Sequence, residues 1–130
     1  MAILNYAAKD VAYSYGGTNV TAMFEPKIDV ERKALLQEFT PAGVAWKQWL
    51  DTGFREMAPF TLTGVEDFTA VTGSRAKVAE GTSGAWIVTY GGTKTTTVTC
   101  LVTSYKSTIA SEKLHLFHVT FQPTGSVVEA

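Results

Sequence analysis

Apolar and polar residues alternate along much of the second half of this chain. Runs rich in threonine and valine are bounded there by Gly, Pro and Asn, which is the composition of strands separated by turns. In residues 94–106 the alternation places Val98, Cys100, Val102 and Ser104 on one face, which we expect to be the core face. The opposite face carries Thr97, Thr99, Leu101, Thr103 and Tyr105. The pattern predicts a mostly β protein.

Two glycine pairs predict tight hairpins, because glycine tolerates the positive φ that short turns require. Gly16-Gly17 separates residues 11–15 from residues 19–25, and Gly91-Gly92 separates residues 85–90 from residues 94–106.

A long strand is predicted near the end of the chain, in "LFHVTFQPTGSV". Phe117, Val119 and Phe121 share one face, which forms an apolar stripe, and the alternate residues share the other. Pro123 lacks an N–H and is expected to stop the ladder of hydrogen bonds, after which Thr124-Gly125 turns the chain.

The middle of the chain has a weaker pattern. Residues 28–36 alternate as a strand, through Ile28, Val30, Ala34 and Leu36, although Ala34, Leu35, Leu36 and Phe39 would also form a helical patch. We favour the strand. Residues 39–59 are predicted as a long loop with one helical turn at 46–50, followed by a strand at 60–64 that Pro59 bounds.

Glycine and capping residues predict the remaining elements. Gly53 and Gly64 are expected to be turns. A short helix is predicted in "TGSRAKVAEGTSG", with Thr72 or Ser74 as N-cap and Gly81 as C-cap.

Length and charge limit the classes of protein. The chain has 130 residues, expected to form one domain, with 11 basic and 12 acidic side chains; this balance argues against a strongly basic nucleic-acid binder. The start lacks the pattern of a signal peptide, and no apolar run is long enough to cross a membrane. We therefore expect synthesis in the cytoplasm and no membrane partner.

A catalytic apparatus is not recognisable. His115 and His118 are three residues apart, which on a strand sends them to opposite faces and argues against a shared metal. "GGTKT", at 91–95, lacks the upstream glycine and following helix of a phosphate loop. Ser83 has no obvious base, and Cys100, the only cysteine, is expected to be an inert core thiol. We predict no catalytic, cofactor-binding or metal-binding residues, and no enzyme.

Aromatic and acidic side chains between the strands are the remaining candidates. Trp46, Trp49 and Phe54 lie in the predicted loop, where exposed tryptophan is costly, so they either fold back as a small core or are buried by another chain. The acidic residues have no spacing typical of a metal site or an acid/base pair and fit a solvated face; they are Glu25, Asp29, Glu31, Glu66 and Asp67.

The order of these motifs resembles the siphophage major tail tube protein family. Members often end with an aromatic-rich strand and a "QPTG" turn, as in "LFHVTFQPTGSV". Upstream, "FTPAGVAWKQWLDTGFREMAPFTLTGVEDF" is similar to the family's loop with a tryptophan, a "TG" and a strand ending in "GxxD". "IVTYGGTKTTTVTCLVTSY" also has the family's threonine-rich strand after a Gly-Gly turn. The resemblance extends from about Ile28 onward.

The resemblance implies two packed antiparallel sheets, as a sandwich or half-barrel, with one short flanking helix. The type VI secretion tube protein has the same fold. It also implies a structural virion protein: hexameric rings of this chain, stacked into a hollow tail tube through which phage DNA is ejected. Expected partners are further copies of the chain, other tail proteins such as the tape measure and terminator, and DNA that passes without specific binding.

Within such an assembly, we expect Trp46, Trp49, Phe54 and Arg55 to contact the next ring or subunit, because aromatic residues and arginine dominate interface energetics. We also expect some of the five acidic residues to face the channel, where they would repel phosphates.

Two other functions are also compatible with the sequence. One is a monomeric β-sandwich that binds a ligand with Trp46 and Trp49. The other is a tail-completion or baseplate component that forms a single ring without stacking.

Overall fold

The computed structural model describes residues 4, 6–43, 45–70, 73–109 and 114–130. It contains two short 3-10 helices, Ala8–Asp10 and Thr21–Met23, and one α-helix, α1 (Ser74–Lys77). The strands are β1 (Ala12–Tyr15), β2 (Thr18–Asn19), β3 (Arg32–Phe39), β4 (Gln48–Met57), β5 (Phe60–Val65), β6 (Ser83–Gly91), β7 (Lys94–Thr108), β8 (Leu116–Pro123) and β9 (Val128–Glu129).

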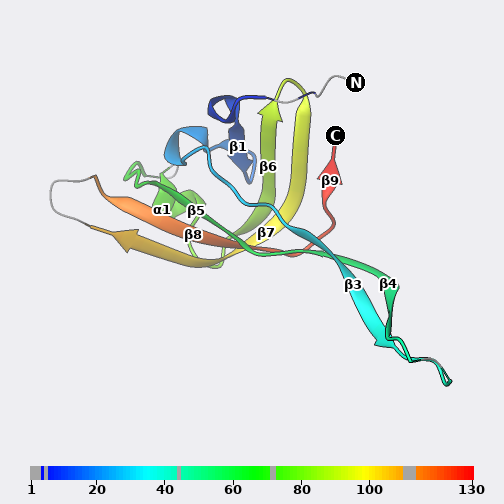
Figure 1. Ribbon diagram of the computed structural model, residues 1–130. Coiled ribbons are helices and arrows are strands. Elements are labelled where there is room, and N and C mark those ends of the chain that lie inside the picture. The colour runs from blue at the N-terminus through cyan, green and yellow to red at the C-terminus, as the bar shows by residue number, and fades with distance from the viewer. Residues whose placement is uncertain (1–3, 5, 44, 71–72, 110–113) are drawn as a thin grey trace.

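Seven of these strands form one antiparallel sheet, in the order β2-β1-β6-β7-β8-β5, with β9 paired to β7. The sheet curls until its last strand meets the segment that follows β2 (Figure 1). An isolated bridge joins Phe24 to Gly64, and the Glu25 N–H donates to the Thr63 carbonyl at 3.0 Å. These contacts cover part of an edge that β5 would otherwise leave unpaired.

The core lies inside the curl and is built around Trp86 of β6, which is fully buried. Burying a side chain of this size contributes roughly 4–6 kcal/mol. Its Nε1–H has no hydrogen-bond partner among the described residues, which costs about 1–3 kcal/mol, so aromatic packing outweighs the orphaned donor. The rings packed on Trp86 come from three other strands and from the segment after β2: Tyr13, Tyr15, Phe24, Phe60 and Phe121.

The alternation predicted for β7 and β8 is confirmed over most of their length. Val98, Cys100 and Val102 are buried, as is the apolar stripe of β8. The prediction for Ser104 and Tyr105 is wrong, because the register shifts between Val102 and Ser104. Beyond this bulge Ser104 is exposed and Tyr105 stacks on Phe117, with ring centroids 5.2 Å apart.

Both glycine hairpins are confirmed. β1 and β2 pair across Gly16-Gly17, with Tyr15 opposite Thr18; β2 ends after two residues, where a 3-10 helix begins. β6 and β7 pair up to Gly91 opposite Lys94. Gly17 and Gly92 both have positive φ, 82° and 54°, which is the reason that glycine suits these turns.

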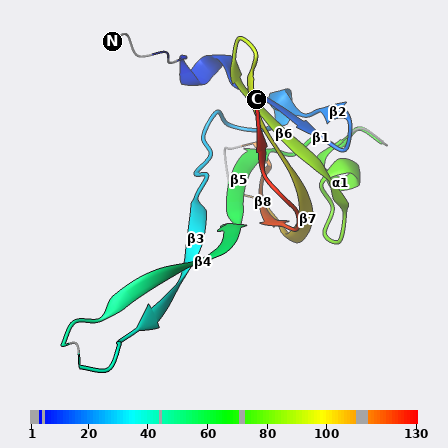
Figure 2. The same ribbon diagram turned by 90° about the vertical axis from the view of Figure 1, so that its right-hand side faces the viewer.

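The segment with the ambiguous pattern is strand β3, and it pairs with β4 in a separate two-stranded sheet. We call this hairpin, residues 32–57, the arm. The predicted loop at 39–59 and helical turn at 46–50 are wrong for Gln48–Met57, which is strand β4. The arm extends away from the curled sheet (Figures 1 and 2), and the Ala58 N–H donates to the Glu31 carbonyl at its base, at 2.8 Å.

The short helix is present at Ser74–Lys77, but its caps differ from the prediction. Gly73 is the N-cap, Ser74 is the first helical residue and Val78 is the C-cap. Thr72, the other predicted N-cap, lies outside the described residues. Gly81 has a positive φ of 84° but comes after the end of the helix, so its prediction as C-cap is wrong.

The turn at the end of β8 interrupts the ladder of hydrogen bonds along β7 but does not end it. β8 ends at Pro123, and the Thr124 N–H still donates to the Thr99 carbonyl of β7, at 2.8 Å. The chain then bends at Gly125 and pairs with β7 again through Val128 and Glu129. β9 therefore continues along the same edge of β7 that β8 occupies.

The predicted fold class is confirmed: a mostly β chain with two antiparallel sheets, a half-barrel curl and one short helix. The larger sheet encloses most of the core, to which Phe24 and Val78 contribute from adjoining segments, and the smaller sheet is the arm. Among the described residues, no helix is long and apolar enough to span a bilayer.

Gly64 lies within strand β5 and is not a turn, contrary to the prediction. A Cβ at this position would overlap the Met23 carbonyl, at the point where the sheet closes. We expect Gly64→Ala to lower the free energy of unfolding by roughly 1–3 kcal/mol in urea denaturation. Gly125→Ala is the control, because a Cβ there meets only ordinary contacts near Thr99. If the two variants were equally stable, this would contradict the close approach of the Met23 carbonyl to position 64.

Candidate interaction surface

The arm exposes large apolar side chains that its own chain does not cover. Every residue of β3 is exposed, and in β4 only Met57 is buried. Trp46, Trp49 and Phe54 are 81%, 61% and 69% exposed. These side chains do not fold back as a small core. Of the two predicted arrangements, a small core or burial by another chain, the second is the one compatible with the structure.

The register of the hairpin divides the arm into two faces. Side chains opposite one another share a face, and neighbours along a strand point to opposite sides. Gln37 lies opposite Leu50 and Phe39 opposite Gln48. Together with Leu35, these residues form what we call the uncharged face of the arm. Nearer the base, the same side of the arm carries Lys33 opposite Glu56, which lie outside the uncharged face.

The other side of the arm is its charged face. Leu36 lies opposite Asp51 and Glu38 opposite Trp49, while Arg55 pairs with Ala34. Apolar side chains are therefore present on both faces. Ionised groups lie along the charged face, but on the other side only at the base of the arm. A two-stranded sheet that is exposed and apolar on both sides is only marginally stable in water by itself.

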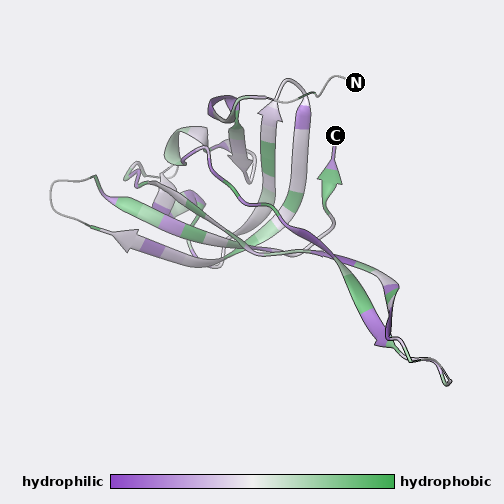
Figure 3. Ribbon diagram, in the orientation of Figure 1, coloured by the Kyte–Doolittle hydropathy of each residue, from purple (hydrophilic) through white to green (hydrophobic). Residues whose placement is uncertain are grey.

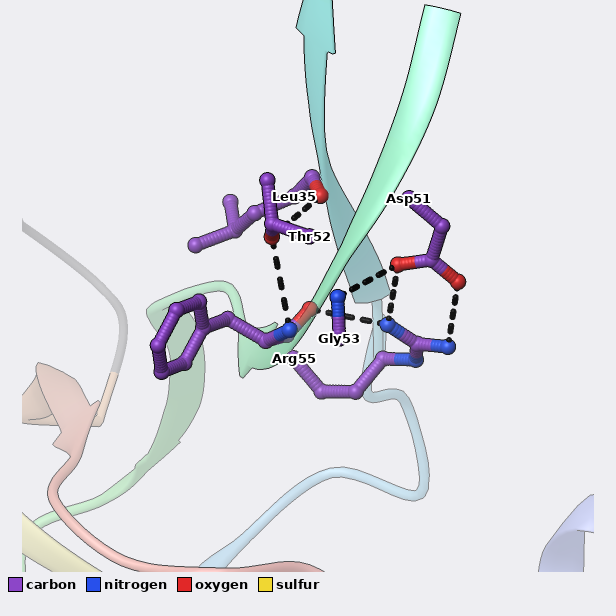
Figure 4. A network of polar contacts seen from close by, with 6 residues as sticks. Leu35, Asp51, Thr52, Gly53 and Arg55 are labelled. Carbon is purple, nitrogen blue, oxygen red and sulfur yellow. Dashed lines mark hydrogen bonds and ion pairs between the residues drawn. The ribbon is translucent and has the colours of Figure 1, made fainter.

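A bulge at the centre of the arm is held by hydrogen bonds (Figure 4). Leu35 faces three residues, Thr52 to Phe54, because the register shifts between Ala34 and Leu36. Gly53 has a φ of 84° and donates its N–H to the Asp51 carboxylate at 2.9 Å. Thr52 donates its hydroxyl to the Leu35 carbonyl at 2.7 Å. Gly53 is thus a bulge residue, not the turn at a hairpin end.

Arg55 completes the bulge. Its guanidinium donates to both oxygens of Asp51, each at 2.8 Å, and to the Phe54 carbonyl at 2.9 Å. The hydrogen bond from Arg55, followed by that from Gly53, lowers the pKa of Asp51. Arg55, predicted as an interface residue, is therefore engaged within its own strand, where it fixes the bend of the arm.

A groove lies where the arm joins the large sheet. It has a volume of ≈ 990 Å³ and lies between Arg32 to Ala34 and Arg55 to Met57 of the arm and residues 125–127 beyond β8. Arg32 and Glu129 form an ion pair across this junction, at 3.3 Å. Neither this groove nor a smaller cleft of ≈ 220 Å³ beside Tyr6 and Tyr90 includes Trp46 or Trp49.

The predicted acidic residues do not gather in one place. Glu25, Asp29 and Glu31 are exposed on the segment that leads to the arm. Asp67 is half-buried and accepts hydrogen bonds from the Thr69 N–H and hydroxyl, which lower its pKa. The Glu66 side chain is completely buried, so it is unavailable to a channel wall, and that part of the prediction is wrong.

Glu66 instead ties helix α1 to the end of the large sheet. Its carboxylate accepts hydrogen bonds from Ser107 and, at 3.5 Å, from Tyr105, and forms an ion pair with Arg75 at 3.1 Å. Desolvation raises the pKa of Glu66, but the hydrogen bonds from Ser107 and Arg75 outweigh it and the net pKa is lowered. Arg75 also lies over the ring of Phe68, 5.0 Å from its centroid.

The two histidines and the cysteine make ordinary packing and hydrogen-bonding contacts. His118 pairs with the Thr63 hydroxyl at 2.9 Å, and the His115 ring packs edge-on against Phe68. Cys100 is buried, and burial raises the pKa of its thiol to about 12. Within the described ranges, no three His, Cys, Asp or Glu side chains come together as metal ligands.

Sequence reasoning missed the arm because the bulge interrupts β4 with residues typical of a turn. Residues 48–51 and 55–57 each fit a strand and keep the same alternation, but Thr52 to Phe54 all lie opposite Leu35. Asp51-Thr52-Gly53 resembles an ordinary turn, a composition that predicts a loop. Recognising two half-strands on either side of a possible glycine bulge would have found the hairpin.

Comparison with solved structures places the fold in a known class. No family model matches the chain, and no curated protein sequence matches it at a significant level. Solved structures do match: the chain shares its fold with components of virus-like tails and contractile injection systems.

Two of these matches cover nearly the whole of both chains. A chain from the tail of an empty gene transfer agent (GTA) particle, computed with helical refinement in C6 symmetry, has a TM-score of 0.74 at 13% identity, over 96% of this chain and 98% of that one. A chain from the sheath/tube terminator of PVC, an extracellular contractile injection system, has a TM-score of 0.67 at 12% identity, over 100% and 99%.

A third match comes from the baseplate of the anti-feeding prophage, with a TM-score of 0.65 at 10% identity, over 92% of this chain and 90% of that one. At such low identity these matches establish the shared fold.

The buried Glu66 should make stability depend on pH. Because its folded pKa lies below the ordinary value of 4.5, its contribution is present above that value and is lost as pH falls through the folded pKa. We expect Glu66→Gln to lower the free energy of unfolding at pH 7 by about 1–3 kcal/mol, and the gap from wild type to narrow by pH 3. Urea denaturation at both pH values measures this.

Glu31→Gln is the control for Glu66→Gln. Its partner Lys33 is exposed and lies at 3.7 Å, so the change should alter stability by less than about 0.5 kcal/mol at either pH. A gap between Glu66→Gln and wild type that stays constant from pH 7 to pH 3 would contradict the assignment.

Proposed function

We propose that this chain is the repeating subunit of a phage-like tail tube, in which hexameric rings stack into a hollow conduit for DNA. The observation that carries the proposal is the shared fold, over nearly the full length of both chains, with a component of a helical, C6-symmetric tail. On this proposal the protein is structural, not an enzyme, and is located in the tail of the virion.

The exposed arm supports assembly of this kind. A subunit that polymerises head to tail must present two different, complementary surfaces, and contacts of this type form rings or open-ended filaments. The arm extends away from the core and carries Trp46, Trp49 and Phe54 uncovered. A neighbouring subunit that covers them would remove their apolar surface from water.

The channel of such a tube should not retain DNA. Glu25, Asp29 and Glu31 are exposed and lie close together in the sequence, so they stay candidates for a channel wall that repels phosphates. Asp67 is the weakest of the remaining candidates, because Thr69 engages its carboxylate. A channel lined mainly by lysine and arginine would contradict this part of the proposal. Tape measure and terminator proteins are the further partners that a tail tube implies.

A single-ring component is the second candidate function. It is favoured by the fold match to chains from a baseplate and from a sheath/tube terminator. A monomeric ligand-binding module is less well supported, because Trp46 and Trp49 protrude from the arm and line neither of the clefts described above.

Negative-stain electron microscopy of the purified protein, over a range of concentrations, distinguishes these functions. A tube subunit forms long hollow polymers with six-fold end views, a single-ring component forms isolated rings, and a binding module stays a 14.1 kDa monomer. Particles that never exceed the monomer at any concentration would overturn the proposal.

Trp49→Ala should leave the subunit folded and impair assembly. Since Trp49 is 61% exposed, its removal should change the urea midpoint little, whereas loss of an aromatic contact residue at an interface costs about 2 kcal/mol or more. This corresponds to a rise of about 30-fold in the concentration needed for polymerisation, measured by sedimentation. Trp49→Phe, the matched control, keeps a ring and should retain most of the assembly. Normal tubes from Trp49→Ala would refute the role of this residue.

A further inference from the structure

The outward side of the large sheet carries almost no charge. Strands β1, β5, β6, β7 and β8 contain two lysines, Lys94 and Lys106, and no arginine, aspartate or glutamate. Their inward residues form the core, and their outward residues are uncharged as far as Lys106. We call this outward side the threonine face, after its threonines: Thr61, Thr95, Thr97, Thr99, Thr103 and Thr120. Figure 3 shows β6 and β7 mostly white to green.

Such a face is unusual for a surface in contact with water, because exposed surfaces normally mix charges of both signs. This chain has 11 basic and 12 acidic residues, but places nearly all of them on the arm, the loops and the helices. The fully buried centre of a protein interface is depleted in charge in this same way. The threonine face therefore has the composition of a surface that a partner covers.

Several hydroxyls on this face are already paired with one another or with the backbone. The hydroxyls of Thr61 and Thr120 lie 3.1 Å apart, the Thr63 hydroxyl pairs with His118 at 2.9 Å, and the Thr103 hydroxyl donates to the Thr120 carbonyl at 3.3 Å. Covering these groups leaves few polar atoms without partners, so the cost of desolvation is small.

A nucleic acid is a poor partner for this surface. Binding to the phosphate backbone depends on lysine and arginine, and the threonine face has no cation between Lys94 and Lys106 along β7. A protein surface without charge is a better match.

We infer that the threonine face of one subunit is covered by the arm of a second copy, with the uncharged face of the arm against it. This inference rests on the proposed function and names the surface that receives the arm. The arm face from Leu35 to Phe39 and the threonine face as far as Lys106 both lack charge, so their contact leaves no ion without its partner. Both are uncovered within their own chain, and a head-to-tail contact requires two different surfaces.

The dimensions agree with this docking. β3 has eight residues, about 27 Å of strand, whereas β7 has 15 residues, about 50 Å. The threonine face is therefore longer than the arm. The charged face of the arm, with Trp49 and the ion pair of Asp51 and Arg55, remains directed away from the threonine face. Burial of Trp49 in the assembly therefore requires contact with a further subunit.

Cysteine pairs test the contact directly. Gln37→Cys on the uncharged face of the arm is combined in turn with Thr61→Cys, Thr99→Cys or Thr103→Cys, all exposed positions. Under oxidation we expect at least one pair to give disulfide-linked ladders on a non-reducing gel. Cys100 does not interfere, because it is buried in the core.

Glu38→Cys is the matched control for Gln37→Cys. It is the next residue of the same strand and is also exposed, but on the charged face. With the same three partners it should form no ladder. The inference would be overturned if Glu38→Cys gave ladders as strong as those from Gln37→Cys. It would also be overturned if none of the three Gln37→Cys pairs gave a ladder although the wild-type protein polymerises.

Added charge supplies an independent test. Thr99→Lys or Thr103→Lys should raise the concentration needed for polymerisation at least about 10-fold, because the lysine would be buried without a partner. Ala22→Lys, an exposed position outside the threonine face, should have little effect.

Two other outcomes are informative. If wild type polymerises and both threonine variants polymerise equally well, the face is covered by something other than the arm, or not at all, and the inference fails while the proposed function stands. If wild type never polymerises, the proposed function fails, and the inference with it.

Discussion

The structure depends on the closure of one curled sheet around Trp86. The rings that surround this indole come from β1, β5 and β8 and from Phe24 beyond β2, so no single hairpin holds the core by itself. Closure requires the backbone at Met23 to approach Gly64 more closely than any side chain at position 64 would allow. The long-range strand pairs and the aromatic packing therefore support each other.

This closure explains why the arm has no core of its own. All large buried apolar residues except Met57, at the base of the arm, lie within or beside the curled sheet, and the register of β3 and β4 leads away from it. The molecule thus separates two roles: the sheet supplies the stability of the fold, while the arm offers apolar surface without contributing to the core. Charges follow the same division, since they concentrate on the arm and loops and avoid the outward side of the sheet.

Sequence reasoning predicted the parts in which side-chain alternation is unbroken. Strands β5, β6, β7 and β8 and both glycine turns followed from it, and so did the core positions Val98, Val119 and Phe121. It failed where the backbone departs from regular geometry. The bulge at Thr103 shifts the alternation of β7. The bulge at Gly53 interrupts β4 with residues typical of a turn, and Gly64 has the composition of a turn although its role is close packing. The burial of Glu66 also depends on Ser107 and Arg75, whose proximity is set by the tertiary fold.

The bulge and the free end of the arm also affect how this protein can evolve. Because side chains alternate with a period of two, inserting or deleting the same even number of residues in each strand of the hairpin preserves both faces of the arm. No core residue lies between Arg32 and Glu56, so such changes in length leave the folded sheet intact. The reach of the arm is therefore free to diverge among descendants of this chain faster than its fold, in steps of about 7 Å.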